Sequence, residues 1–231
     1  DIKPVGKNPN QLLPEEEALI LQYYQTYRYM GYRRYTYSLL DKNIVAVDPS
    51  TLYRLLSKHG LLTKWVPGSL IGKKPPEPTK PNQRWHTDLM QISIFGDIYY
   101  LQNIIDGYSR YIVNWDVHID GSALNTSTLL QQASETLMLN EKPEIVADNG
   151  PEFRAKEFRQ IANLIGKKIK IRAYHPQSNG VAERLNRTVK KECLSKASYD
   201  NLIAVKSLLG KWVKEYNETR LHASLEYMTP I

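Results

Sequence analysis

RWHTDLMQISIFGDIYYLQNIIDGYSRYIVNWDVHI, residues 84–119, is the stretch that decides the fold class. It contains three runs rich in β-branched and aromatic residues, separated by short polar connections at Gly96-Asp97 and Asp106-Gly107. Runs of this composition, bounded by Gly and Asp, are typical of strands joined by tight turns. We therefore predict three antiparallel strands at the start of a domain.

Beyond these strands, the pattern alternates between helix and strand. The order βββαβαβ, followed by further helices, indicates an α/β domain with a mixed five-stranded sheet. The predicted elements are a helix over 121–139, a strand over 143–148, a helix over 154–166, a strand over 167–173, a helix that opens at Val181 and a final helix over 199–220.

The first part of the chain has a different pattern, with short helices over residues 11–63. The last of them is well delimited, by Asp48 as N-cap, Pro49 at the first helical position and Gly60 after its end. Short helices that end in a polar, basic one favour a small all-α helix-turn-helix domain over residues 1–63, although a helical bundle without a DNA role stays open. The candidate DNA-binding residues of this part are Arg33, Arg34, Ser50, Thr51, Tyr53, Arg54 and Lys58.

Residues 64–84 contain five prolines and little periodicity, which predicts an extended basic linker between the helical domain and a second domain over 85–231. The net charge of the 231 residues is +7, and the excess lies in residues 1–84, with 13 Lys/Arg against 7 Asp/Glu. This imbalance favours a polyanionic partner for that part, with a merely solvated basic surface as the alternative.

The chain has one cysteine, Cys193, so an internal disulfide and a Cys/His zinc cluster are both excluded. We expect Cys193 to be a small buried side chain and the setting to be reducing and cytoplasmic. No apolar run approaches the roughly 20 residues of a membrane span.

Three carboxylates stand out by their positions. Asp88 lies within the first strand, Asp148 ends the fourth strand, and Glu183 lies in the first turn of the helix after the loop YHPQSNG. An aspartate inside a strand is disfavoured unless something satisfies its charge. A divalent cation would do so, because Mg²⁺ prefers oxygen ligands and is commonly held by a few carboxylates.

The helix that begins near Glu183 also has a distinctive basic face. At about 100° per residue, Glu183, Asn186, Arg187 and Lys190 are predicted to lie opposite the apolar stripe of this helix. An exposed i,i+4 ion pair contributes only about 0.2–0.5 kcal/mol, so stability is a weak reason for this array. A phosphate backbone along the helix would give each cation a partner, while a plain ion pair stays open for Arg187.

Taken together, these motifs resemble a known family. WHTDL, DNGPEF and YHPQSNGVAERLNRTVK are similar to the three signatures of the D,D,E integrase core, which retroviral integrases and bacterial insertion-sequence transposases share. The 34 residues between Asp148 and Glu183 fit the family's usual interval of 35 with a slightly shorter loop. The zinc domain of retroviral integrases needs paired ligands that a chain with one cysteine does not supply, so the resemblance favours the transposase branch.

The resemblance implies an RNase H-like fold and DNA strand cleavage and joining with two Mg²⁺ ions, for which Mn²⁺ substitutes. Asp88 would bridge both ions, Asp148 would hold one and Glu183 the other. The implied partners are double-stranded DNA, at the element's ends and at its target, and further copies of the chain.

Several residues would contact that DNA. The resemblance places Lys190 at the terminal phosphates and brings the loop with Tyr174 and Gln177 to the DNA end. Asn149 would orient the substrate or a metal-bound water, or only shape the turn with Gly150. We expect a DNA transposase; the alternatives are a retroelement-type integrase, a DNA-binding regulator with an inactive core, and an RNase H-like nuclease of RNA–DNA hybrids.

Overall fold

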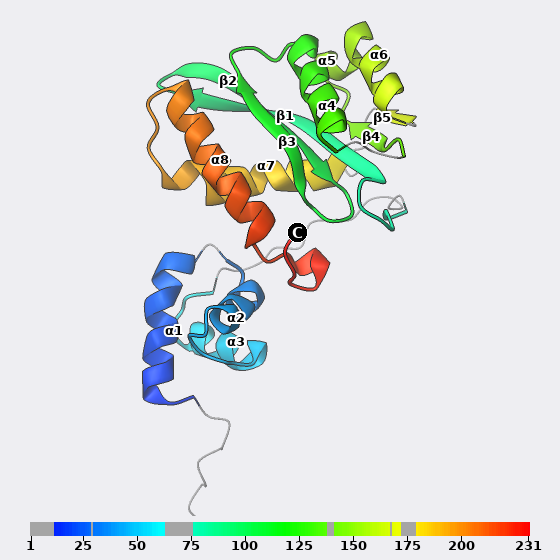
Figure 1. The fold of residues 1–231 in the computed structure, drawn as a ribbon. Helices are drawn as coiled ribbons and strands as arrows, with labels where there is room; N and C mark the ends of the chain where they lie inside the picture. The colour runs from blue at the N-terminus through cyan, green and yellow to red at the C-terminus, as the bar shows by residue number, and fades with distance from the viewer. Residues whose placement is uncertain (1–11, 29, 63–75, 138–140, 167, 172–178) are drawn as a thin grey trace, which may run out of the picture. The chain divides into compact units, whose positions relative to one another are not determined.

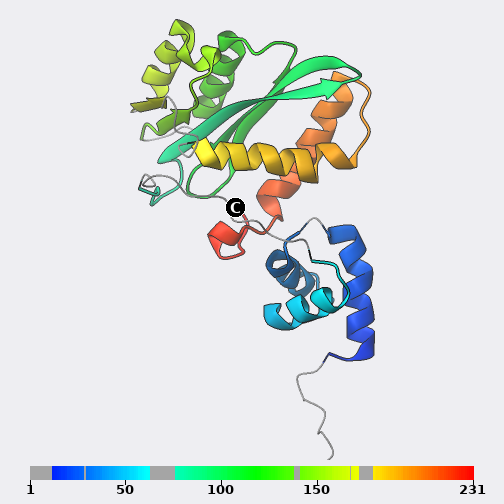
Figure 2. The same cartoon turned by 180° about the vertical axis from the view of Figure 1, so that it is seen from behind.

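The computed structural model describes residues 12–28, 30–62, 76–137, 141–166, 168–171 and 179–231 (Figures 1 and 2). The chain divides into two compact units. The first comprises Asp1–Leu70 and Leu221–Met228, and the second comprises Ile71–Arg220 and Thr229–Ile231. We predicted one catalytic core over residues 85–231. The grouping of residues 221–228 with the N-terminal helices differs from that prediction.

Three helices form the first unit: α1 (Pro14–Tyr27), α2 (Tyr32–Asp41) and α3 (Pro49–Lys58). Their apolar faces meet in one small core, as expected for amphipathic helices. The signals that delimit α3 in the sequence are present, since the Asp48 side chain accepts from the Ser50 backbone N–H and Gly60 has a φ of +65°. The core residues are Ile20, Tyr24, Tyr35, Leu39, Val45, Leu52, Leu55 and Leu56.

A short C-terminal segment completes this unit. The 3-10 turn η3 (Ala223–Leu225) lies between His222 and Met228, which form an isolated antiparallel bridge. The Tyr227 ring stacks on Tyr37 of α2, with 4.3 Å between the ring centroids. This contact explains why the segment groups with the helices rather than with the sheet.

The second unit is built on a five-stranded mixed sheet with the strand order β3-β2-β1-β4-β5. The first three strands are antiparallel hairpin neighbours, and β4 and β5 run parallel to β1. The predicted sheet is therefore confirmed. The strands are β1 (Arg84–Ile94), β2 (Asp97–Asp106), β3 (Ile112–His118), β4 (Glu144–Ala147) and β5 (Lys168–Ile171).

Helices cover both faces of this sheet, as Figures 1 and 2 show from opposite sides. Because side chains alternate along a strand, β1 supplies both cores. Met90, Ile92 and Ile94 pack with α7 and α8, whereas Trp85 packs with the cluster of α4, α5 and α6. The helices are α4 (Ala123–Leu137), α5 (Pro151–Arg154), α6 (Lys156–Ile165), α7 (Gly180–Glu192) and α8 (Leu202–Glu218), with the 3-10 turn η2 (Leu194–Lys196) after α7.

The predicted helices of this unit are present, and the sequence missed the short α5. Cys193 is buried in the core beside α7, as expected. No helix of the described segments is long and apolar enough to cross a membrane.

One buried side chain ties the edge strand β3 to α8. Asn217 accepts from the Ile112 N–H at 2.9 Å and donates to the Ile112 carbonyl at 3.1 Å.

Asn217→Ala would leave both backbone groups buried without partners, so we expect a loss of about 2–4 kcal/mol of unfolding free energy. Urea unfolding followed by tryptophan emission measures this, and the exposed neighbour Glu218→Ala is the control. A loss no greater than the control's would contradict the role assigned to Asn217.

Candidate active site

The strand register brings Asp88 and Asp148 together. Asp88 lies at mid-strand in β1, opposite Asn103 of β2, and β1 pairs on its other side with β4. The parallel pairing joins His86 to Val146, and continuing it by two residues places Asp148 beside Asp88. The two aspartates therefore meet where β4 ends.

The third carboxylate comes from α7, which covers the face of β1 to which Asp88 belongs. Glu183 lies in the first turn of this helix and is half-buried. The pKa of Asp88 is raised to about 7, mainly by burial and in addition by the negative charges of Asp148 and Glu183. Hydrogen bonds from Leu89 and Asn186 act in the opposite direction. The three acids are therefore close enough for their charges to act on one another.

Local hydrogen bonds hold two of these carboxylates. The Asp88 side chain accepts from the Leu89 N–H at 3.0 Å and from the Asn186 amide at 2.8 Å. Asp148 accepts from the Gly150 N–H at 2.9 Å, which shapes the turn into α5. Within the described residues, no three His, Cys, Asp or Glu side chains converge closely enough to form a closed metal-ligand set. The acids are neighbours, but Asp88 and Asp148 accept from different partners.

The donor set nevertheless fits a hard divalent cation. Carboxylate oxygens are the ligands that Mg²⁺ prefers. Besides burial, the described groups that shift the pKa of Asp88 most are two acids and two hydrogen-bond donors. None of these groups is a cation, so they do little to offset the negative charge of this acid. A raised carboxyl pKa in such surroundings marks a place where a bound cation would be strongly favoured.

Asn186 differs from the prediction, which placed it on the outward face of α7 with Glu183. That placement is wrong, because Asn186 is buried, at 8% exposure. Its amide donates to Asp88, and its carbonyl oxygen accepts from Asn103 Nδ2 at 2.7 Å. Asn186 thus orients Asp88 from α7. On the helical wheel of α7, position 186 lies directly beside the apolar stripe. This neighbourhood was the signal in the sequence that could have indicated that Asn186 is buried.

The other predicted residues of this unit have varied environments. Arg187 and Lys190 are exposed on α7, as expected, and Asn149 is exposed in the turn after β4. Glu152 is half-buried, and its pKa is raised by burial and by the charge of Asp148. Tyr174 and Gln177 lie outside the described residues.

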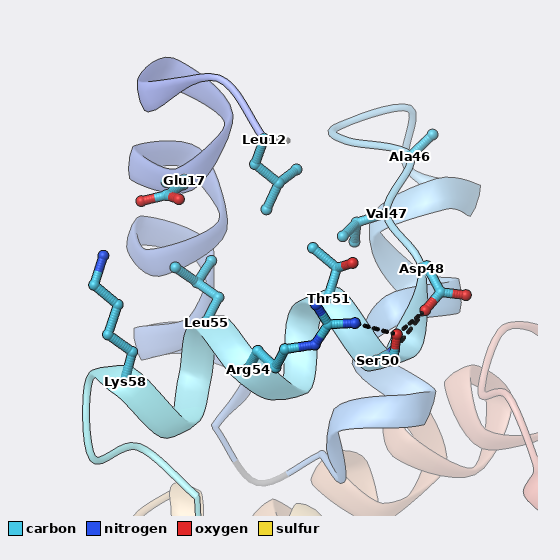
Figure 3. A pocket seen from close by; sticks show the side chains of 10 residues that line it. All are labelled: Leu12, Glu17, Ala46, Val47, Asp48, Ser50, Thr51, Arg54, Leu55 and Lys58. Carbon is cyan, nitrogen blue, oxygen red and sulfur yellow. Dashed lines mark hydrogen bonds between the residues drawn. The ribbon is translucent and has the colours of Figure 1, made fainter. Parts of the chain in front are cut away.

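In the helical unit, a hollow of about 810 Å³ opens between α1 and α3 (Figure 3). Its wall includes Ser50, Thr51, Arg54 and Lys58, four of the residues predicted to bind DNA. Ser50, Arg54 and Lys58 are exposed, and Thr51 is half-buried. The hollow has acidic and apolar lining as well, from Glu17, Asp48, Leu12, Ala46, Val47 and Leu55.

Hydrogen bonds orient the polar groups at the start of α3. The Ser50 hydroxyl donates to Asp48 and accepts from the Arg54 guanidinium at 3.2 Å, as Figure 3 shows. Beside them, Tyr53 meets the Tyr32 ring edge-on at 5.2 Å.

Two further predicted residues come from α2. Arg33 is exposed and donates to the Tyr32 hydroxyl, whereas Arg34 is half-buried. Most of the predicted residues of α2 and α3 are thus accessible to a ligand.

The raised pKa of Asp88 has a consequence for stability. Between about pH 4 and pH 7 the folded chain holds a proton on Asp88 that the unfolded chain releases, so the contribution of Asp88 to stability should fall as pH rises through this window. The lowered pKa of His86 acts in the opposite direction over part of this window, so the effect of Asp88 is the difference between the wild type and an Asp88 variant. The slope is at most about 1.4 kcal/mol per pH unit. Asp88→Asn should remove this slope and stabilise the protein at pH 8, and Mg²⁺ should stabilise the wild type but not the variant.

Thermal unfolding at pH 5, 6.5 and 8, with and without Mg²⁺, measures these effects. The control is Asp97→Asn, at an exposed position at the start of β2. An Asp88→Asn profile that matches the control would refute the assignment.

Two family profiles match this chain, and both are described as an integrase core domain. They cover residues 78–176 and 167–230. InsD, the transposase of insertion element IS2 from Escherichia coli, is 29% identical over 217 residues, which cover 87% of this chain and 71% of InsD. A protein of insertion element IS407 from Burkholderia multivorans is 27% identical, covering 88% of this chain and 74% of its own length.

A third relative, the InsK protein of insertion sequence element IS150 from Escherichia coli K12, is 26% identical over 154 residues. That match spans 66% of this chain and 54% of InsK, about half its length.

Two solved structures share the fold. The catalytic core domain of the HTLV-2 integrase, in complex with magnesium, superposes with a TM-score of 0.51 at 21% identity, covering 65% of this chain and 94% of that domain. A chain of the simian T-cell lymphotropic virus intasome gives a TM-score of 0.59 at 16% identity, covering 91% of this chain and 72% of its own. The sheet order, the flanking helices and the two family profiles agree that the chain belongs to the integrase-core superfamily, and the curated relatives that it resembles are proteins of bacterial insertion elements.

Proposed function

We propose that this chain is a DNA transposase, or a catalytic part of one, that cuts and joins DNA strands at the ends of a mobile element. The observation that supports this most directly is the meeting of Asp88, Asp148 and Glu183 at the junction of β1, β4 and α7. The insertion-sequence relatives favour a transposase over a retroelement integrase or an inactive regulator.

The proposed chemistry depends on how the chain holds its three carboxylates. Asp88 stands between the two others, kept in place by the Asn186 amide, so it is the natural ligand to share. Two divalent cations, Mg²⁺ or Mn²⁺, bound here would activate the attacking water or 3′-hydroxyl and stabilise the departing 3′-oxygen. A solved relative of the same fold contains magnesium, which supports a divalent ion.

The DNA contacts follow from the exposed cations. Arg187 and Lys190 follow Glu183 by four and seven residues on α7, so a phosphate backbone lying along this helix would meet both. On the helical unit, we propose that Arg54 and Lys58 of α3 bind the element's ends.

We also propose that the chain acts as a multimer on DNA. Solved relatives of the same fold include a trimeric integrase core and an intasome. Joining two ends of one element requires two active sites to be held together, which one copy of this chain does not provide.

The triad predicts a specific loss of activity. Asp88→Asn, Asp148→Asn and Glu183→Gln should each lower Mg²⁺-dependent strand transfer by a factor of about 10³ or more, because each removes a charged metal ligand. DNA affinity should change less than about threefold. The duplex for this assay is the sequence that the wild-type chain selects from a random pool, with a free 3′-hydroxyl at one end.

Glu152→Gln is the matched control for this experiment, since Glu152 is a nearby half-buried acid outside the triad. It should keep most of the activity. Transfer near the wild-type rate in any of the three triad variants would refute the proposed mechanism.

The two DNA-binding surfaces should respond differently to mutation. Arg54→Ala should weaken binding to the selected duplex by about 5–100-fold and weaken binding to unrelated DNA much less, if Arg54 contacts bases. Lys190→Ala should weaken both equally and reduce the salt slope of log Kd by about one, as expected for a phosphate contact.

Fluorescence anisotropy at several salt concentrations measures both effects. The control is Ser57→Ala, an exposed position on α3 that does not line the hollow. Equal losses on both DNAs for Arg54→Ala would mean that α3 does not select the sequence.

A further inference from the structure

The Asn179 side chain joins the start of α7 to strand β1. Its amide nitrogen donates to the Thr87 carbonyl at 2.9 Å, and its oxygen lies 3.4 Å from His86 Nδ1. All three residues are buried, with exposures of 4% for Asn179, 2% for Thr87 and 6% for His86. From the sequence we predicted Asn179 only as part of a loop and gave His86 no role.

The contact has a defined direction. Because the Asn179 nitrogen faces a carbonyl, its oxygen must face His86, so the imidazole donates through Nδ1–H. Burial lowers the pKa of His86 to about 4, which keeps the ring neutral at ordinary pH. On the far side of the ring, a Cβ on Gly107 would lie 3.1 Å from Nε2, so the ring has little room to turn.

Asn179 does not make the contact that its position would suggest. It is the N-cap of α7, where an asparagine side chain usually accepts a hydrogen bond from the first turn of its own helix. Here no such cap bond forms. The side chain instead reaches β1 one residue beyond His86, where the pairing of β1 with β4 ends. The capping energy of about 1 kcal/mol is thus given up for a tertiary contact.

This contact has a counterpart on the other side of Glu183. Asn179 lies four residues before Glu183 and Asn186 lies three residues after it, so all three lie within one sector of α7. Asn186 donates to Asp88 of the same strand. The part of α7 that contains Glu183 is therefore tied to β1 at both ends, and Asp88 lies on the strand to which it is tied.

We propose that His86 and Asn179 are positioning residues, which anchor the first turn of α7 to β1 and thereby set the distance between Glu183 and Asp88. The inference rests on the proposed function, because this distance matters when the two carboxylates serve one cation site. Neither residue touches the reacting atoms. Their effect is exerted through Glu183, and a displacement of about 1 Å at such a site is enough to cost a large part of the rate.

The first test asks whether the anchor exists, and it does not depend on activity. In Asn179→Ala and His86→Phe, backbone amides of the first turn of α7 should exchange with deuterium about tenfold faster, while those of its last turn stay unchanged. His86→Gln keeps a side-chain N–H and should restore most of the protection. Unchanged exchange at the first turn would overturn the proposal.

The second test asks whether the anchor serves the site. Affinity for Mn²⁺ alone, measured by electron paramagnetic resonance, should fall about 10–100-fold in Asn179→Ala and His86→Phe, as for partners that orient metal ligands. The strand-transfer rate constant should fall by a similar factor, with the Kd for DNA unchanged. Recovery of both in His86→Gln would separate positioning from a general loss of structure.

Two controls measure what mere destabilisation does. His118→Phe replaces a half-buried histidine of β3, and Asn217→Ala breaks a buried contact elsewhere in the unit. Both should keep their Mn²⁺ affinity at temperatures below unfolding. If they lose as much as Asn179→Ala does, or if Asn179→Ala loses nothing, His86 and Asn179 are structural residues only. If the wild type binds Mn²⁺ but transfers no strand, the proposed function is refuted. The Mn²⁺ affinities of the variants would still test whether His86 and Asn179 position the carboxylates.

Discussion

The repulsion that Asp148 and Glu183 exert on the half-buried Asp88 is the constraint on which the second unit depends. A charge at mid-strand, flanked by two further acids, is costly in a protein interior. The structure keeps it there by fixing the neighbouring backbone, with β4 paired in register with β1 and α7 packed across its face. Among the described residues, an apolar frame holds these acids together, and no cation is among the groups that shift the pKa of Asp88 most.

Buried amides complete that frame. Asn103 of β2, Asn186 of α7 and Asn179 at the start of α7 form hydrogen bonds that no apolar side chain could form, and they link the helix to the sheet at the level of the carboxylates. Amides suit this place because they are neutral. They can donate to Asp88 without neutralising it, whereas a lysine or arginine would offset the charge that a metal ion needs.

Much of this could be predicted from the sequence because the signals are local. The runs rich in β-branched and aromatic residues in residues 84–119 predicted the three antiparallel strands, and Asp48, Pro49 and Gly60 indicated the limits of α3. Asp88 and Asp148 could be singled out because an acid inside or directly after a buried strand is rare without a reason. The helical-wheel argument was right for Arg187 and Lys190, which are exposed, and it failed for Asn186, which is buried.

By itself, the sequence determined the strands and helices, the three acids and the basic character of α7, since each depends on residues that are close along the chain. Only the tertiary structure decided which polar groups face inward. Asn186 and Asn179 point to β1 because strand partners some 90 residues away offer them an acceptor. It also decided that residues 221–228 join the helical unit through the Tyr37–Tyr227 stack. Such pairings depend on how distant segments pack, and no local periodicity encodes them.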